Sequence, residues 1–113
     1  MNKEVKRILS SLKIDGKSID VAHLRYKGEN KTFVTWTMLP ERPSLNGDDQ
    51  NLASIVEVDI DIYSDSNYLD ILQEIKKIMK ENEWIWTGDS EEMYEEETSL
   101  YHRTSTFEKE RVL

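Results

Sequence analysis

The stretch LASIVEVDIDIY, residues 52–63, decides the fold, because apolar and acidic side chains alternate over most of its length. Side chains of a β-strand point alternately to its two faces, so residues two apart share a face. The apolar side chains share one face: Val56, Val58, Ile60 and Ile62. The acidic side chains share the other face: Glu57, Asp59 and Asp61. The pattern predicts a strand with one face in the core and the other polar or paired with a partner.

Helical patterns lie on both sides of this strand in the sequence. From Asn2 onward, apolar residues recur at helical spacing as far as Leu12. Asp15-Gly16 is predicted to end this first helix, because glycine tolerates a left-handed turn. A second helix with an apolar stripe is predicted over residues 67–82.

The remaining patterns indicate strands and two long loops. Further strands are predicted at residues 19–26, 32–39, 84–86 and 100–110. The first two are expected to form a hairpin, because a polar, glycine-containing turn separates them. The loops are polar and span residues 40–50 and 87–98, which marks them as functional or mobile segments.

The order of these elements predicts a single α+β domain over residues 1–113. We expect a mainly antiparallel or mixed β-sheet with two α-helices packed on one face. The apolar faces of the strands and of the second helix should meet in one core. The predicted core residues are Val34, Trp36, Met38, Val56, Val58, Ile60, Ile62, Leu69, Leu72, Ile75 and Ile78.

Composition narrows the classes of function. The chain has 113 residues, a formal net charge of -8 and no cysteine, so a disulfide framework and a thiolate nucleophile or metal site are excluded. The negative charge disfavours specific nucleic-acid binding, which depends on lysine and arginine contacts to phosphate. It also disfavours an anionic membrane surface. No long apolar run indicates a membrane span or a secretory signal, which is consistent with the cytoplasm.

Few residues suggest catalysis or ligand binding. The carboxylates of Glu57, Asp59 and Asp61 share a strand face. They could hold a hard cation such as magnesium, or they could simply form an ordinary polar face. His23 and His102 stand in no recognisable catalytic frame. We therefore expect no enzymatic activity, no cofactor and no resident metal. The tryptophans at 84 and 86 either pack beneath the second helix or stack against bases or sugars.

Two loop segments are candidate partner contacts. Residues 91–97 hold five glutamates and no basic residue, interrupted by one methionine and one tyrosine. Methionine and aromatic side chains are enriched at interfaces, so this acidic segment could receive a partner. A second acidic pair lies in the earlier loop. The candidate contact residues are Asp48, Asp49, Glu91, Glu92, Met93, Tyr94, Glu95 and Glu96.

Several short segments, taken in order, resemble a family of small proteins from siphophages and Gram-positive prophages. These segments are Thr32-Phe33-Val34, Asp48-Asp49-Gln50, Val56-Glu57-Val58-Asp59-Ile60, Tyr68-Leu69-Asp70-Ile71-Leu72, Tyr94, Glu97-Thr98 and Tyr101-His102-Arg103. The resemblance spans residues 26–108, and the order of the motifs carries it. The acidic run at residues 91–97 is longer than the family pattern leads us to expect.

The resemblance implies a tail terminator or tail-completion protein of the lambda minor-tail type. Such a protein self-associates into a hexameric ring that caps the tail tube, contacts head-completion proteins and joins tail to head. It would act in the host cytoplasm during assembly and remain in the virion tail. Two alternatives stay open, namely an acidic DNA-mimic inhibitor and a metal-dependent enzyme built on the strand carboxylates.

Overall fold

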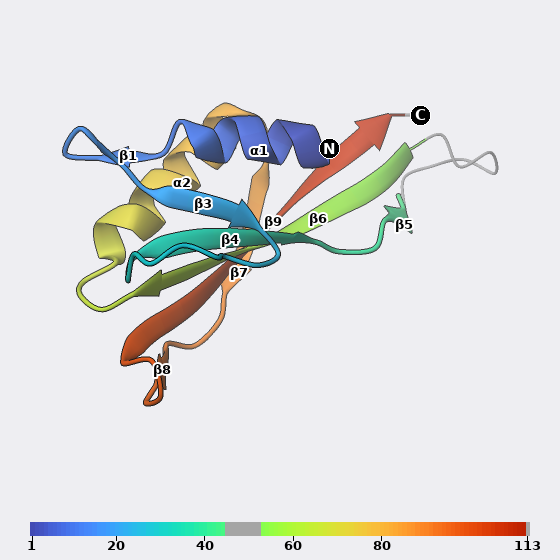
Figure 1. Ribbon diagram of the computed structural model, residues 1–113. Helices are drawn as coiled ribbons and strands as arrows, with labels where there is room; N and C mark the ends of the chain where they lie inside the picture. Colours follow the sequence, from blue (N-terminus) through green and yellow to red (C-terminus); the bar gives the residue numbers. More distant parts are fainter. Residues whose placement is uncertain (45–52, 113) are drawn as a thin grey trace.

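A computed structural model describes residues 1–44 and 53–112, which form two helices and nine strands. The helices are α1 (Asn2–Ser10) and α2 (Leu69–Glu81), and both lie on one face of the main sheet (Figure 1). The strands are β1 (Lys13–Ile14), β2 (Lys17–Ser18), β3 (Asp20–His23), β4 (Phe33–Met38), β5 (Arg42–Pro43), β6 (Ala53–Ser64), β7 (Ile85–Asp89), β8 (Met93–Glu95) and β9 (Leu100–Val112). The predicted α+β class is confirmed.

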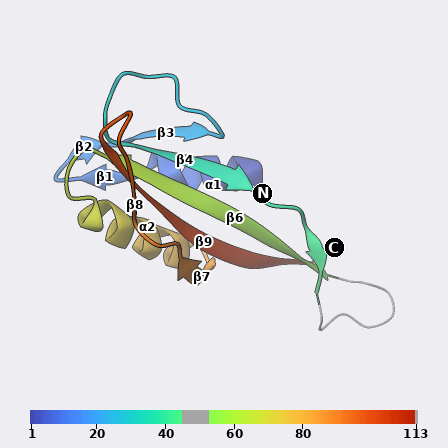
Figure 2. The same cartoon turned by 90° about the horizontal axis from the view of Figure 1, so that it is seen from below.

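The main sheet is built around the two longest strands, β6 and β9, which run side by side along the molecule (Figure 2). Its order is β3-β4-β6-β9-β7, with β5 paired to β6 and β8 paired to β9. All pairs in this sheet are antiparallel except β3 with β4. Because β7 and β8 pair with different parts of β9, they share one edge of the sheet.

The core lies between the helices and the apolar face of β6, as the alternation predicts. The fully buried face of β6 includes Val58, Ile60 and Ile62, and Phe107 of β9 lies opposite Val58. Nine of the predicted core residues are buried, and Met38 is partly buried against the same cluster. Leu69 is the exception at 51 % exposed, because it is the first residue of α2 and lies at the helix end. The core also takes in side chains of α1, among them Val5, Ile8 and Leu9.

The N-terminal region differs from the prediction in where the first helix ends. α1 stops at Ser10, and Asp15-Gly16 instead forms the turn of the β1–β2 hairpin. Both turn residues have positive φ, 52° at Asp15 and 79° at Gly16, the conformation that a two-residue hairpin turn requires. Asp-Gly suits a hairpin turn as well as the end of a helix, so the dipeptide alone does not distinguish them.

The expected hairpin of β3 and β4 is wrong, since the two strands run parallel. The chain therefore reverses direction twice between them. Asp20 holds this connection together, because its carboxylate accepts hydrogen bonds from Tyr26 Oη and Asn30 Nδ2, both at 2.7 Å. Leu24, with φ of 64°, makes the left-handed turn that leaves β3.

The predicted loop at residues 87–98 is partly wrong, because it contains the end of β7 and all of β8. Of the earlier predicted loop, Arg42–Pro43 pairs with β6, while residues 45–50 lie outside the described residues. Neither helix in the part of the chain that the structure describes is long and apolar enough to cross a membrane.

Candidate functional site

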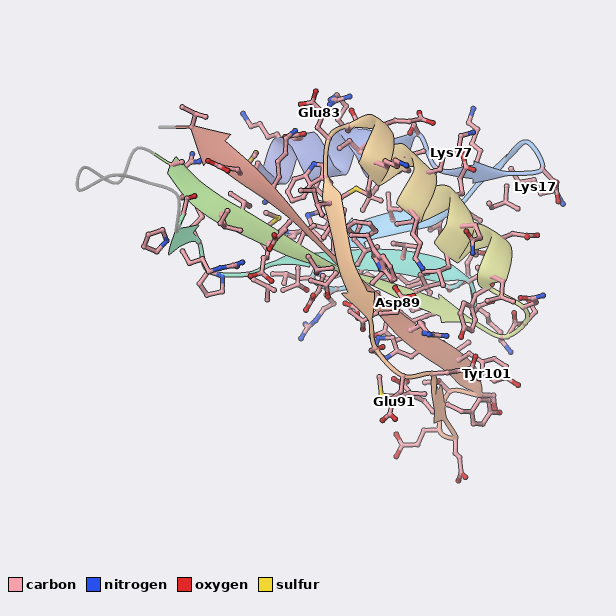
Figure 3. All side chains as sticks on the ribbon, turned by 180° about the vertical axis from the view of Figure 1, so that it is seen from behind. Lys17, Lys77, Glu83, Asp89, Glu91 and Tyr101 are labelled. Atoms are coloured by element: carbon pink, nitrogen blue, oxygen red, sulfur yellow. The ribbon has the colours of Figure 1, made fainter. Side chains whose placement is uncertain are left out.

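The predicted contact residues of the second acidic segment come together at one protruding corner of the sheet. β8 runs antiparallel to the start of β9, with Tyr94 opposite Tyr101 and Met93 opposite His102. We call residues 91–97 the acidic tip, and all of their side chains are exposed. The tip projects from the lower end of the molecule in Figure 1, and Glu91 and Tyr101 mark it in Figure 3. Asp48 and Asp49 lie outside the described residues.

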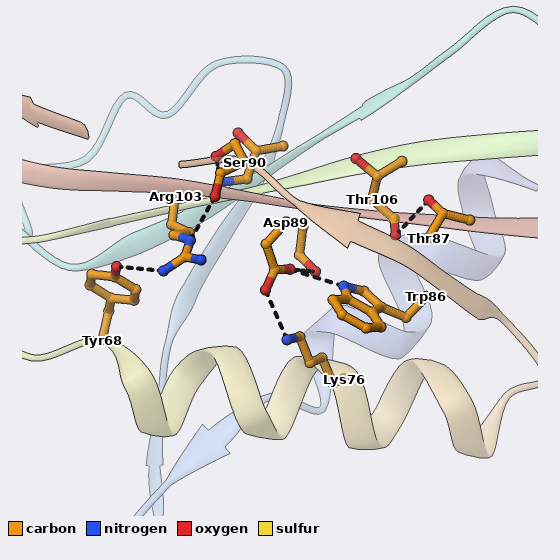
Figure 4. A network of polar contacts seen from close by, with 10 residues as sticks. Tyr68, Lys76, Trp86, Thr87, Asp89, Ser90, Arg103 and Thr106 are labelled. Carbon is orange, nitrogen blue, oxygen red and sulfur yellow. Dashed lines mark hydrogen bonds and ion pairs between the residues drawn. The ribbon is translucent and has the colours of Figure 1, made fainter. Parts of the chain in front are cut away.

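Hydrogen bonds hold the base of the acidic tip against β9 and the start of α2 (Figure 4). Arg103 Nε donates to the carbonyl oxygen of Ser90 at 2.9 Å, and the Thr104 N–H donates to Ser90 Oγ at 2.9 Å. Tyr68 Oη donates to the carboxylate of Glu92 and lies 3.4 Å from Arg103 Nη1. Burial raises the pKa of Tyr68, and the hydrogen bond to Glu92 adds to the rise while Arg103 opposes it. The tip is therefore fixed to the domain by neutral and charged partners.

The acidic tip also presents apolar surface. Tyr94 is 52 % exposed, and its ring lies 5.1 Å from that of Tyr101 at an interplanar angle of 60°. Met93 and Leu69 are exposed as well, and Leu69 and Tyr101 line the same hollow at the start of α2. Exposed aromatic and methionine side chains of this kind are typical of the centre of an interface.

A second exposed apolar surface lies where β7 faces α2, and the prediction of contact residues missed it. It is a groove with a volume of about 370 Å³. We call it the β7 groove, and its lining residues are Lys76, Lys80, Trp84, Ile85, Trp86 and Phe107. The buried rings of Trp84 and Phe107 form its inner side, and the ring of Trp86 is 50 % exposed. Ile85 borders the groove but stands opposite Glu108, so its side chain, 63 % exposed, points to the other face of the sheet. Packing beneath the helix is thus confirmed for Trp84, and Trp86 stays half-exposed at the rim.

Asp89 fixes the position of Trp86 and Lys76 in the β7 groove (Figure 4). Its carboxylate accepts hydrogen bonds from Trp86 Nε1 at 2.9 Å, Lys76 Nζ at 2.9 Å and Ser105 Oγ at 2.8 Å. The Lys76 ammonium also lies 4.3 Å from the centre of the Trp86 ring, within cation–π range. Burial disfavours the charged form of Asp89, but these three hydrogen bonds outweigh burial and lower the pKa of the carboxyl.

Replacing Asp89 by asparagine should therefore destabilise the fold in a pH-dependent way. A carboxyl whose pKa is lowered on folding stabilises the fold above its unfolded pKa of about 3.9, and this contribution disappears as pH falls through the folded pKa. We expect Asp89→Asn to lower the free energy of unfolding by about 1–2 kcal/mol at neutral pH. The gap between variant and wild type should close towards about pH 2.

Urea unfolding at several pH values checks this expectation. Asp65→Asn is the matched control, because Asp65 is exposed and makes no side-chain hydrogen bond within the described residues. A gap between wild type and Asp89→Asn that stays constant from neutral to acid pH would contradict the charged role of Asp89.

The carboxylates on the uncovered face of β6 are engaged by neighbouring strands. Asp61 Oδ1 lies 2.9 Å from His102 Nε2 and accepts a hydrogen bond from Thr104 Oγ1 at 2.5 Å. Asp59 accepts one from Thr106, and Glu57 forms an ion pair with Arg42. In residues 1–44 and 53–112, no three histidine, aspartate or glutamate side chains are placed to hold a metal ion. The arrangement favours the polar-face interpretation over a cation site or a free row of phosphate-like charges.

Aromatic rings cross this uncovered face from strand to strand. Tyr26, Phe33, Tyr63 and His102 are stacked in sequence, with centroid separations of 4.1, 4.8 and 4.2 Å. The other histidine, His23, lies exposed with its ring 5.3 Å from that of Trp36. Both histidines therefore have structural neighbours, and neither lies beside a serine nucleophile in the described contacts.

Comparison with protein-family models and with curated proteins finds no match to this chain. The assignment of a function therefore rests on the order of its motifs and on the two exposed apolar surfaces. The sequence indicated the acidic tip through its composition. It indicated the β7 groove less directly, through tryptophans two residues apart beside a lysine-bearing helix.

Proposed function

We propose that this chain is a structural subunit of a siphophage or prophage tail, which forms a hexameric ring that caps the tail tube and joins it to the head. The order of motifs across residues 26–108 supports the family, as set out above. The observation that carries the proposal is the pair of exposed apolar surfaces on one edge of the sheet, the acidic tip and the β7 groove. An isolated subunit leaves both uncovered, whereas a ring gives each a place to be buried.

Ring closure requires a subunit with two different, complementary surfaces. A head-to-tail contact repeated around an axis forms a closed ring when its rotation closes, and each subunit then uses one surface to bind and the other to be bound. The acidic tip and the β7 groove differ in shape and charge, so they suit this heterologous type of contact. The engaged carboxylates of the opposite sheet face leave that surface polar for other partners.

The charge of the chain suits a conduit for DNA. Each copy carries a formal net charge of -8, and carboxylates repel the phosphates of a duplex. A ring of such subunits would let DNA pass without holding it. The proposed partners are further copies of the chain, the tail tube and head-completion proteins, first in the host cytoplasm and then in the virion tail.

The test is removal of the chain from the phage or prophage that encodes it. Tails and filled heads should then accumulate separately in electron micrographs, and supplying the wild-type chain should restore joined particles. Joined particles at the normal yield without the chain would refute the proposal.

A further inference from the structure

The acidic tip and the β7 groove of one molecule lie on the same side of β9 but cannot meet. Tyr94 is opposite Tyr101, and Trp86 is opposite Phe107. Tyr101 and Phe107 are six residues apart along a regular strand, which separates them by about 20 Å at ~3.3 Å per residue. Both belong to the set of β9 residues that pairs with the buried face of β6, so both surfaces lie on the helix side.

The two surfaces are complementary in charge and in apolar character. Within the described residues, the side chains of Glu91, Glu96 and Glu97 have no ion-pair or hydrogen-bond partner, and neither does Lys80 in the β7 groove. The groove adds the half-exposed Trp86, and the tip adds the half-exposed Tyr94. Each surface therefore has an unpaired charge beside an exposed apolar side chain, and the charges are opposite in sign.

We propose that the acidic tip of one copy docks in the β7 groove of the next copy and forms the contact that builds the ring. This inference rests on the proposed function. Tyr94 covers Trp86, while the tip glutamates face Lys80 at the rim. Burying apolar surface supplies the attraction, and the opposite charges fix the orientation of the two copies.

The structure prepares the acidic tip for this role. Its base is held by Arg103 and Tyr68, so a short hairpin is already ordered before the next copy arrives. Asp89 likewise holds Trp86 and Lys76 in position on the groove side. Ordering both surfaces in advance reduces the entropy lost when they associate.

Two single substitutions, each disabling one surface, test the docking. Trp86→Ala removes the half-exposed ring from the β7 groove, and Tyr94→Asp places a charge on the acidic tip. Without Trp86, Asp89 keeps its hydrogen bonds from Lys76 and Ser105, and Tyr94 makes no side-chain hydrogen bond in the described contacts. Each variant alone should sediment as a monomer of 13.3 kDa. Mixed together, they retain one intact tip and one intact groove, so they should form a 1:1 heterodimer of about 27 kDa that cannot extend.

The control is the same type of substitution at the other edge of the sheet. Leu24 follows β3 and is 60 % exposed, so Leu24→Asp should assemble as the wild type does. Thermal unfolding verifies that each variant is folded. If Trp86→Ala or Tyr94→Asp is unfolded, the charge reversals Lys80→Glu in the groove and Glu96→Lys on the tip are used in its place. Each of these charge reversals should weaken association about two- to fivefold. In 1 M NaCl the association of the wild type should weaken by a similar factor, because the Debye length falls to about 3 Å.

The possible results separate the docking from the ring. Variants that assemble like the wild type, or a mixture that stays monomeric, overturn the docking and leave the proposed function standing. Heterodimers from the mixture support the docking. The wild-type chain could also stop at a dimer in which each tip fills the partner's groove. Heterodimers together with such a wild-type dimer would support the docking and contradict the ring.

Discussion

Ile60→Ala should lower the free energy of unfolding by about 2–5 kcal/mol, because truncating a buried aliphatic side chain loses transfer free energy and leaves a cavity. Ile60 is fully buried at the middle of β6, between Trp36 of β4 and Ser105 of β9. Both neighbouring strands and the helices above pack around this position, so the site cannot easily collapse. Chemical denaturation followed by tryptophan fluorescence measures the loss.

Ile85→Ala is the matched control for this prediction. The substitution is chemically identical, but Ile85 is mostly exposed, so its cost should stay below about 1 kcal/mol. A similar cost at both positions would show that the alternation of β6 does not determine which side chains form the core.

Under the proposed function and docking, Tyr94→Asp should reduce the yield of joined phage particles roughly tenfold or more. A charge buried in an apolar contact costs several kcal/mol, and each 1.4 kcal/mol is a factor of ten in affinity. The change leaves Tyr68, Arg103 and Ser90 in place, so the base of the acidic tip stays attached to the domain. Trimming residues 90–92 would instead remove Ser90 and Glu92, which bond the base of the tip to Arg103, Thr104 and Tyr68, and a loss of folding could then not be told from a loss of docking. Electron microscopy of particles made with the variant gives the yield.

Leu24→Asp controls for the general effect of an added surface charge on particle yield. It should support joined particles at the wild-type level, since the residue lies at the opposite edge of the sheet. A normal yield with soluble, folded Tyr94→Asp would show that the acidic tip takes no part in head–tail joining.

The fold was predictable where local patterns are sufficient. The alternation of β6 identifies its buried face because a strand places every second residue on the same side. The apolar stripe of α2 identifies that helix because apolar residues recur at helical spacing. The predicted start at residue 67 lies two residues before the observed start at Leu69. In both elements the information lies within about a dozen consecutive residues.

The errors arose where contacts between distant residues decide the structure. The connection between the parallel strands β3 and β4 is bridged by hydrogen bonds from Tyr26 and Asn30 to Asp20, and no periodicity of the sequence indicates such a connection. β8 has three residues, and its register comes from Tyr101 and its neighbours in β9. A glutamate-rich segment without alternation is therefore compatible with a loop or with a strand until its partner is known.

The candidate site was half predictable for a related reason. Unusual composition identified the acidic tip, since five glutamates around Met93 and Tyr94 are visible in the sequence. The β7 groove exists because the Trp86 ring is only partly covered by α2. The ring is held there by Asp89 and Lys76, which form an ion pair at 2.9 Å. The two-residue spacing predicts that Trp84 and Trp86 lie on the same face of the strand. It does not predict which of the two side chains stays exposed.

The mass of the wild-type chain in solution tests self-association into a ring most directly. Sedimentation velocity at about 100 μM and low ionic strength should show a species of six copies of the 13.3 kDa chain, about 80 kDa, because a heterologous contact closes only when the ring is complete. A chain that remains at 13.3 kDa at every concentration, or that stops at a dimer, would contradict the ring.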